Sequence, residues 1–149
     1  MRQMKFKVLF KIKQYNESFK EEEIIFLESK THEIYSLCIH GNYVVVPYNN
    51  TVLTIFQDEC ECIDILQFTG LVDRNGKEIY EGDILETKYE DKCEEGGFGI
   101  ARNGVYFKDG CFGTIGEITR EFLPFSDYPI KDEYIIGNIH DNPELLNPQ

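Results

Sequence analysis

The chain has no long apolar run. None of its 149 residues lies in a stretch near the roughly 20 consecutive apolar residues that a membrane-spanning helix needs. The N-terminal stretch MRQMKFKVLFKIK places lysines between its apolar residues, so we expect no secretory signal peptide there. These two features predict a cytoplasmic protein without a membrane partner.

Positive charge is also scarce. The 27 acidic residues outnumber the 15 basic ones, and the formal net charge is -12. An average field of this sign repels phosphate, so we expect no direct binding of nucleic acid. A basic protein partner is favoured instead, although the acidic clusters at 21–23, 58–64 and 90–95 also fit a solvated surface.

Cysteines are few, odd in number and unsuitably spaced for a metal. The five are Cys38, Cys60, Cys62, Cys93 and Cys111. A structural zinc site usually takes a C-x₂-C pair answered by a second pair, and only C-x-C occurs here, at Cys60 and Cys62. We expect reduced cysteines, no metal and no cofactor. The glycines of GGFGIARNG also lack the GK[ST] ending of a phosphate-binding loop.

Tryptophan is absent, but nine tyrosines and eleven phenylalanines join many Ile, Val and Leu residues. This composition favours pleated, half-buried strands and predicts a mainly β fold of short antiparallel hairpins. Expected strands are Met4–Lys13, Tyr43–Tyr48, Thr51–Phe56, Cys62–Phe68, Ile79–Leu85, Val105–Phe107, Cys111–Ile115 and Tyr134–His140. Asn49-Asn50 and Asp109-Gly110 are predicted hairpin turns. Pro47 predicts an edge strand or an outward-facing position, because it has no N–H to donate.

Other segments have weaker signals. Residues 14–23 are interpreted as a loop, 24–27 as either a strand or part of a helix, and the glycine-rich, acidic stretch 88–103 as a mobile loop. Asn142 and Pro143 predict a single capped helical turn through Leu146. We expect an N-terminal β-rich region over residues 1–61, packed against a C-terminal SH3-like barrel over 62–149.

The most informative stretch is Leu66–Glu86, LQFTGLVDRNGKEIYEGDILE. Asp73 to Gly76 predict a tight turn, and Gly82 predicts a bulge or sharp bend between two strand patterns. Together with the C-terminal IIGNIHDNPELL, this stretch resembles the YopX-like family of phage and prophage proteins. The matching positions are Phe68, Thr69, Gly70, Leu71, Asp73, Gly76, Ile79, Tyr80, Glu81, Gly82, Asp83, Ile136, Gly137, Asn138, Ile139, Asn142, Pro143, Glu144 and Leu145. Outside these two stretches only Met1–Phe6 shows a weaker match, and a tryptophan frequent near the family's N-terminus is missing here.

The resemblance brings no reaction with it. It implies an accessory protein of phage or prophage origin, in the cytoplasm of a bacterial host, that forms homo-oligomers. We expect such a protein to bind a host or phage protein rather than to catalyse a reaction. Two alternatives remain open, a small metal-dependent hydrolase and an acidic DNA mimic that inhibits a host nucleic-acid enzyme.

The family positions allow two interpretations. In one, Tyr80, Glu81, Asp83 and Asn138 converge as a polar site, with Asp83 as a base or cation ligand. In the other, the glycines hold turns and bulges while the acids accept hydrogen bonds from neighbouring backbone donors. The second is favoured, because no nucleophile accompanies the carboxylates. The candidate motif is Thr69, Gly70, Asp73, Gly76, Tyr80, Glu81, Gly82, Asp83, Gly137, Asn138, Asn142 and Pro143.

Overall fold

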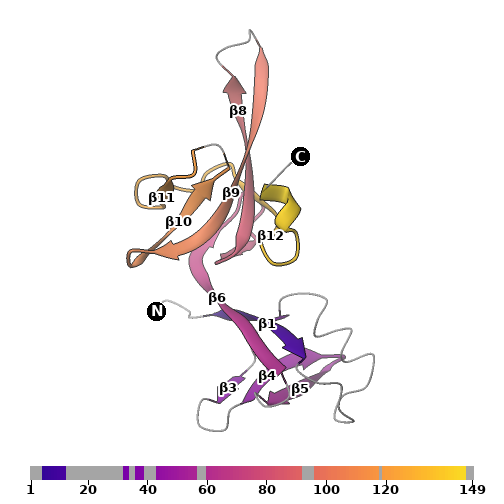
Figure 1. The fold of residues 1–149 in the computed structure, drawn as a ribbon. Helices are drawn as coiled ribbons and strands as arrows, with labels where there is room; N and C mark the ends of the chain where they lie inside the picture. Colours follow the sequence, from indigo (N-terminus) through magenta and orange to yellow (C-terminus); the bar gives the residue numbers. More distant parts are fainter. Residues whose placement is uncertain are drawn as a thin grey trace. The chain divides into compact units, whose positions relative to one another are not determined.

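The structure is a computed structural model, and it describes residues 5–12, 32–33, 36–38, 43–56, 60–91, 96–117 and 119–146. These residues are mainly β, as predicted, and their strands pair in antiparallel order (Figure 1). They fall into two compact units that divide between Gln67 and Phe68. No helix in this part of the chain is long and apolar enough to cross a membrane. The predictions for residues 14–27 lie outside the described residues.

The N-terminal unit contains two sets of paired strands. Strand β1 (Phe6–Ile12) pairs with β2 (His32–Glu33) and with the first part of β6 (Cys60–Val72). Strands β3 (Ser36–Cys38), β4 (Tyr43–Tyr48) and β5 (Thr51–Phe56) form a three-stranded sheet. Buried Val44 and Val46 alternate with more exposed residues along β4, which is the period-2 pattern of a strand with one buried face.

The turn between β4 and β5 confirms the hairpin prediction. Asn49 and Asn50 have φ angles of 43° and 62°, which suits a two-residue turn with left-handed backbone at both positions. Of the two alternatives predicted for Pro47, the edge strand is wrong, because β4 is the central strand of its sheet. The described register of β4 with β3 ends at Val45, however, so proline is exposed two positions beyond that ladder.

The C-terminal unit is built on a five-stranded sheet in the order β11-β10-β9-β8-β12. Its strands are β8 (Asp83–Asp91), β9 (Gly97–Lys108), β10 (Cys111–Gly116), β11 (Phe122–Pro124) and β12 (Tyr134–Asn138). Strand β7 (Glu78–Tyr80) pairs instead with the end of β6. Buried Ile79, Leu85 and Val105 form the core, and Phe125, Ile130 and Ile135 pack against it. Within the described residues β11 and β12 are the two edges of the sheet, so the SH3-like barrel stays a prediction.

The turns of this unit follow the predictions closely. Asp109 and Gly110 have φ angles of 53° and 82° and join β9 to β10. The predicted strand Ile79–Leu85 is divided into β7 and β8 by a sharp turn at Gly82, where φ is 82°. A single turn of 3-10 helix, η1 (Pro143–Leu146), lies where the helical turn was expected.

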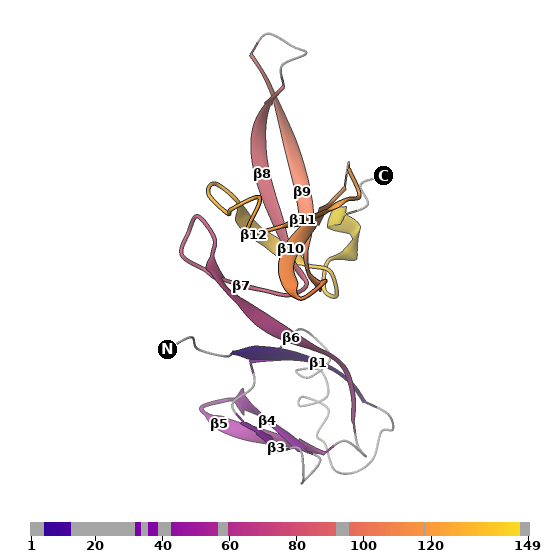
Figure 2. The same cartoon turned by 90° about the vertical axis from the view of Figure 1, so that its left-hand side faces the viewer.

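The prediction of a mobile loop over 88–103 is wrong for its described residues. Strands β8 and β9 continue as a paired ribbon from Ile84↔Gly104 out to Asp91↔Gly97, and only 92–95 between them lie outside the described residues. Figures 1 and 2 show the two strands leaving the other strands of the sheet together. The glycines of this stretch suggested a loop, but Gly99 is paired in the ribbon and the Tyr89 ring from the opposite strand lies over it. A Cβ on Gly99 would collide with that ring.

The turn at Gly82 yields a stability prediction. Gly82→Val should lower the free energy of unfolding by about 1 to 3 kcal/mol, because a β-branched residue is strained at this φ. Urea denaturation followed by circular dichroism measures the loss. Gly76→Val is the control, because Gly76 also has a positive φ, of 79°, and no atom lies within 4 Å of the position that a Cβ would occupy. This variant therefore measures the cost of backbone strain alone. An unchanged midpoint for Gly82→Val would mean that the turn tolerates other residues.

Candidate functional site

The candidate motif lies where four segments of the C-terminal unit meet. These are the end of β6, the turn before β7, the turn between β7 and β8, and the end of β12 with η1. Four polar residues of the motif are buried, with only 5–7% of their surface exposed to solvent: Thr69, Asp73, Asp83 and Asn138. Polar groups buried to this extent need hydrogen-bond partners. Their hydrogen bonds therefore decide between the two interpretations of the motif.

Asp73 accepts three hydrogen bonds from backbone amides. Its Oδ1 accepts from Asn75 N at 2.8 Å and Lys77 N at 2.9 Å, which closes the turn that contains Gly76 at a φ of 79°. Its Oδ2 accepts from Ile135 N at 3.0 Å. One carboxylate thus shapes the turn and attaches it to the start of β12.

These bonds set the protonation of Asp73. Burial raises the pKa of its carboxyl, but the amides of Ile135, Lys77 and Asn75 and the charge of Lys77 together lower it more. The net pKa lies below the ordinary value of 3.8. A carboxyl with a lowered pKa is ionised at neutral pH and is a weak base, so Asp73 is suited to accepting hydrogen bonds.

Asp83 has a similar set of partners. Its Oδ2 accepts from Tyr80 N at 2.8 Å across the Gly82 turn, and its Oδ1 accepts from Asn138 Nδ2 at 3.4 Å. Asn138 Oδ1 in turn accepts from His140 N at 2.9 Å. The turn itself is held by Gly82, whose N donates to Val105 O at 2.8 Å and whose O accepts from Ile139 N at 2.7 Å.

The predicted polar cluster is therefore assembled only in part. Asp83 and Asn138 are joined by a hydrogen bond, but the Tyr80 hydroxyl donates to Glu78 Oε2 at 3.0 Å. The Tyr80 ring is buried and packs on Phe68 with a centroid separation of 5.5 Å. Glu81 lies half-buried in the turn before Gly82.

Thr69 and Gly70 form an irregular step in β6. The register of β6 with β7 shifts between Phe68 and Val72, and Gly70 has a φ of 86° there. Thr69 Oγ1 donates to Ile79 O at 2.9 Å and accepts from Leu71 N at 3.2 Å. The hydroxyl thus supplies a bond across the two strands where their ladder is interrupted.

Gly137 lets η1 approach β12 closely. A Cβ at this position would lie 2.7 Å from Asn142 Oδ1 and 2.8 Å from Leu145 Cδ1, distances that force a displacement. The prediction that Asn142 caps η1 with its side chain is wrong. Its Oδ1 accepts instead from Asn138 N, at 3.4 Å. Its main-chain O accepts from Leu145 N at 3.1 Å, just before Pro143 opens the turn.

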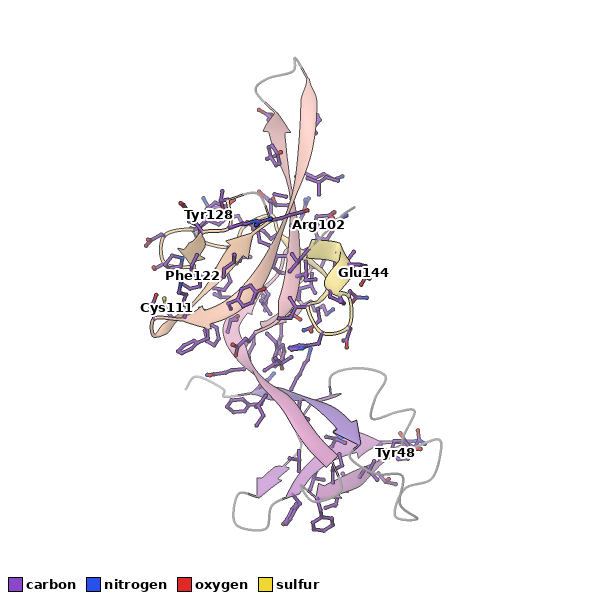
Figure 3. The ribbon with its side chains drawn as sticks, in the orientation of Figure 1. Tyr48, Arg102, Cys111, Phe122, Tyr128 and Glu144 are labelled. Carbon is purple, nitrogen blue, oxygen red and sulfur yellow. The ribbon has the colours of Figure 1, made fainter. Side chains whose placement is uncertain are left out.

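A second cluster was not predicted from the sequence. Glu86 Oε2 accepts from Arg102 Nε at 2.9 Å, and Glu86 Oε1 accepts from Tyr134 Oη at 2.6 Å. Arg102, labelled in Figure 3, also donates through Nη1 to Leu145 O at 3.5 Å. Glu86 and Arg102 lie directly opposite each other on β8 and β9, a signal that was concealed because 88–103 was interpreted as a loop.

This cluster also shifts pKa values. The Tyr134 hydrogen bond lowers the pKa of Glu86 most, burial raises it, and Arg102 lowers it further, so it lies below the ordinary value of 4.5. The same bond to Glu86, with burial, raises the pKa of Tyr134. The arrangement stabilises an ionised glutamate across three strands, β8, β9 and β12.

The chemistry of both clusters is that of hydrogen-bond acceptors. The carboxylates of Asp73, Asp83 and Glu86 each accept from amide, guanidinium or phenol donors on other segments. Among the described residues, no three His, Cys, Asp or Glu side chains are grouped to hold a metal ion. These observations agree with the favoured interpretation, in which the acids satisfy neighbouring donors.

The lowered pKa values predict acid sensitivity. Asp73 and Glu86 have native pKa values below their ordinary 3.8 and 4.5, so the unfolded chain takes up protons first as the pH falls. The stability they contribute is present above these ordinary values and is lost as the pH falls from them to the lower native pKa values. Asp73→Asn should cost about 1 to 3 kcal/mol at pH 7 and flatten the decline below about pH 5.

Urea denaturation at several pH values measures this effect. Asp109→Asn is the control for loss of one negative charge, because Asp109 is exposed in a turn and asparagine tolerates its φ of 53°. A wild-type pH profile in Asp73→Asn would show that another group causes the acid sensitivity.

Comparisons with known proteins extend the resemblance seen in the sequence. The model of the YopX protein family matches residues 8–147, a range that includes segments outside the two stretches that carry the resemblance. A search of curated proteins finds no significant match. The crystal structure of protein EF1440 from Enterococcus faecalis is similar at 22% identity and a TM-score of 0.45, over 98% of this chain and 99% of that chain. Because the family model spans nearly the whole sequence, the chain belongs to the YopX protein family.

Proposed function

We propose that the protein is a non-catalytic accessory protein of phage or prophage origin that binds copies of itself and a basic protein partner in the bacterial cytoplasm. The observation that supports self-association is the exposed β8–β9 arm, formed by residues 87–91 and 97–101. Here Phe98 is 74% exposed and Ile100 is 52% exposed. Large side chains exposed to this extent in one place are typical of an interaction surface.

The arm is a two-stranded ribbon without further strands beside it in the described residues. The register of β12 with β8 begins at Glu86, and that of β10 with β9 reaches only Asn103. Its two faces can be assigned from the register, because directly opposed residues share a face and neighbours along a strand alternate. Lys88 opposes Ile100 and Glu90 opposes Phe98. All four side chains therefore lie on one face and are exposed.

The charges on this face are self-complementary. Two arms packed face to face around a two-fold axis near position 89 place Lys88 of each copy against Glu90 of the other, with Phe98 and Ile100 buried between them. A two-fold contact needs this kind of self-complementary patch. A second copy of the chain is therefore the occupant that the arm fits best.

The basic partner is supported by the net charge of -12. Charge of one sign speeds encounter with a partner of the opposite sign and excludes phosphate-bearing nucleic acid. A hydrolase is disfavoured, because the carboxylates of Asp73 and Asp83 are already engaged with backbone and amide donors. The DNA-mimic alternative has no observation of carboxylate spacing to support it.

Self-association through the arm predicts that Phe98→Glu weakens the oligomer by at least about tenfold, because it buries a charge at the contact. Sedimentation velocity over a concentration series measures the dissociation constant. Phe107→Glu is the control, since Phe107 is 51% exposed on the same strand outside the arm. A monomeric wild-type protein contradicts self-association, and an unaffected Phe98→Glu oligomer excludes the arm as its contact.

A charge exchange tests the two-fold arrangement. Lys88→Glu and Glu90→Lys should each weaken the homo-oligomer by repulsion, whereas a mixture of the two variants restores opposite charges at both contacts. Recovery of association in the mixture alone supports the proposed register. Equal association in the separate and mixed variants contradicts it.

Binding to a basic partner predicts a strong dependence on salt. The association rate should fall steeply as the Debye length shortens from about 30 Å at 0.01 M to about 8 Å at 0.15 M ionic strength. Surface-immobilised binding across a salt series measures the rate for a host or phage protein captured from lysate, with duplex DNA as the control ligand. A salt-independent rate contradicts electrostatic steering, and duplex binding at 0.15 M contradicts the exclusion of nucleic acid.

A further inference from the structure

A cavity lies beside the base of the arm in the C-terminal unit. It measures about 350 Å³ and lies between Thr87–Tyr89 of β8 and residues 128–129 and 131–133 of the loop that leads into β12. Tyr89 is 42% exposed and Tyr128, labelled in Figure 3, is 45% exposed. Two partly exposed tyrosines thus line a single cavity, one from the sheet and one from the loop.

The buried charge of this cavity is negative. Of its charged lining residues, Glu133 is only 4% exposed, whereas Lys88, Lys131 and Asp132 are exposed. The lysines thus keep their ammonium groups accessible to water, while the glutamate is fixed in place. A buried carboxylate exerts a stronger local field than exposed charges, because solvent screens it less.

Only one oxygen of this carboxylate is engaged by the described residues. Glu133 Oε2 accepts from Lys131 N at 2.8 Å and Asp132 N at 3.1 Å, whereas Oε1 has no hydrogen-bond donor in the part of the chain that the structure describes. The position of Glu133 is fixed further by its main-chain O, which accepts from Arg74 N at 2.9 Å. A glutamate with open acceptor capacity on one oxygen thus lines the same cavity as the two tyrosines.

We propose that this cavity binds the guanidinium group of an arginine side chain presented by a protein partner, an inference that rests on the proposed binding of a basic protein. A guanidinium donates to a carboxylate in its own plane and stacks on aromatic rings, which matches Glu133 together with Tyr89 and Tyr128. A lysine ammonium fits less well, because it is a more strongly hydrated point charge without a planar face.

The test uses the full chain, ¹⁵N-labelled, titrated with N-acetyl-arginine N-methylamide and followed by NMR. We expect saturable shifts in the amides of residues 87–89, 128 and 130–133. The citrulline analogue, which has the same shape without charge, should give none, and the lysine analogue should bind more weakly. No saturable shift, or equal shifts with citrulline, overturns the proposal. Tighter binding of N-acetyl-aspartate N-methylamide through the lysines also overturns it.

Two variants, one at a buried residue and one at an exposed residue, separate a loss of arginine binding from a loss of folding. Glu133→Gln retains an amide oxygen for the Lys131 and Asp132 N–H groups but removes the charge, and it should weaken arginine binding at least about tenfold. Tyr128→Ala changes an exposed side chain and should weaken it about threefold. Phe107→Ala, outside the cavity, is the control and should bind as wild type does. Unchanged binding in both cavity variants overturns the proposal.

The outcome also separates this inference from the proposed function. If the arginine analogue does not bind while the captured partner still associates in a salt-dependent manner, the cavity is excluded and the binding of a basic protein stands. If neither the analogue nor the captured partner binds, the proposed binding of a basic protein fails as well. If the partner binds and Glu133→Gln weakens it as it weakens the analogue, the cavity is the point of contact.

Discussion

The Asp73 carboxylate accepts hydrogen bonds from three backbone N–H groups, and the C-terminal unit depends on this interaction. The amides of Asn75 and Lys77 belong to its own turn, whereas the amide of Ile135 comes from a strand 62 residues later in the sequence. Loss of this carboxylate would leave three partly buried donors without their acceptor, at a total cost of about 1 to 3 kcal/mol. The same junction holds Glu133, because its carbonyl accepts from Arg74. The Asp73 side chain therefore fixes the turn and attaches it to Ile135, and the backbone of the same turn is bonded to Glu133, which lines the cavity.

Local chemistry explains why part of this structure was predictable. Asn49-Asn50 and Asp109-Gly110 accept positive φ at low cost, so their hairpins follow from a few neighbouring residues. The β1 alternation and the Gly82 turn are equally local. The β8–β9 arm was missed because its glycines and acids are typical of loops, and its pairing depends on the Tyr89 ring covering Gly99 on the opposite strand. Tertiary partners of that kind leave no short-range signal.

The same distinction applies to the candidate site. Sequence alone indicated that Asp73, Asp83 and Asn138 act together with glycines, and it favoured a structural role for the acids. It did not indicate the Glu86–Arg102–Tyr134 cluster, whose members come from three strands, nor the true direction of the Asn142 side chain. It also gave no sign of the cavity, because Tyr89 and Tyr128 are brought together only by the fold. Family signature residues here organise turns, while the exposed groups proposed for binding lie outside the signature.

Strand β6 belongs to both compact units, and this limits how the gene can be divided. The boundary between the two compact units falls inside β6, whose residues up to Gln67 pair with β1 and whose Phe68 and Val72 pair with β7. Cutting the gene at this boundary would leave each fragment with a truncated strand rather than a finished domain. Recombination, which exchanges complete modules most easily, is thereby expected to transmit both units as one cassette. The family match across residues 8–147 is consistent with such joint transmission.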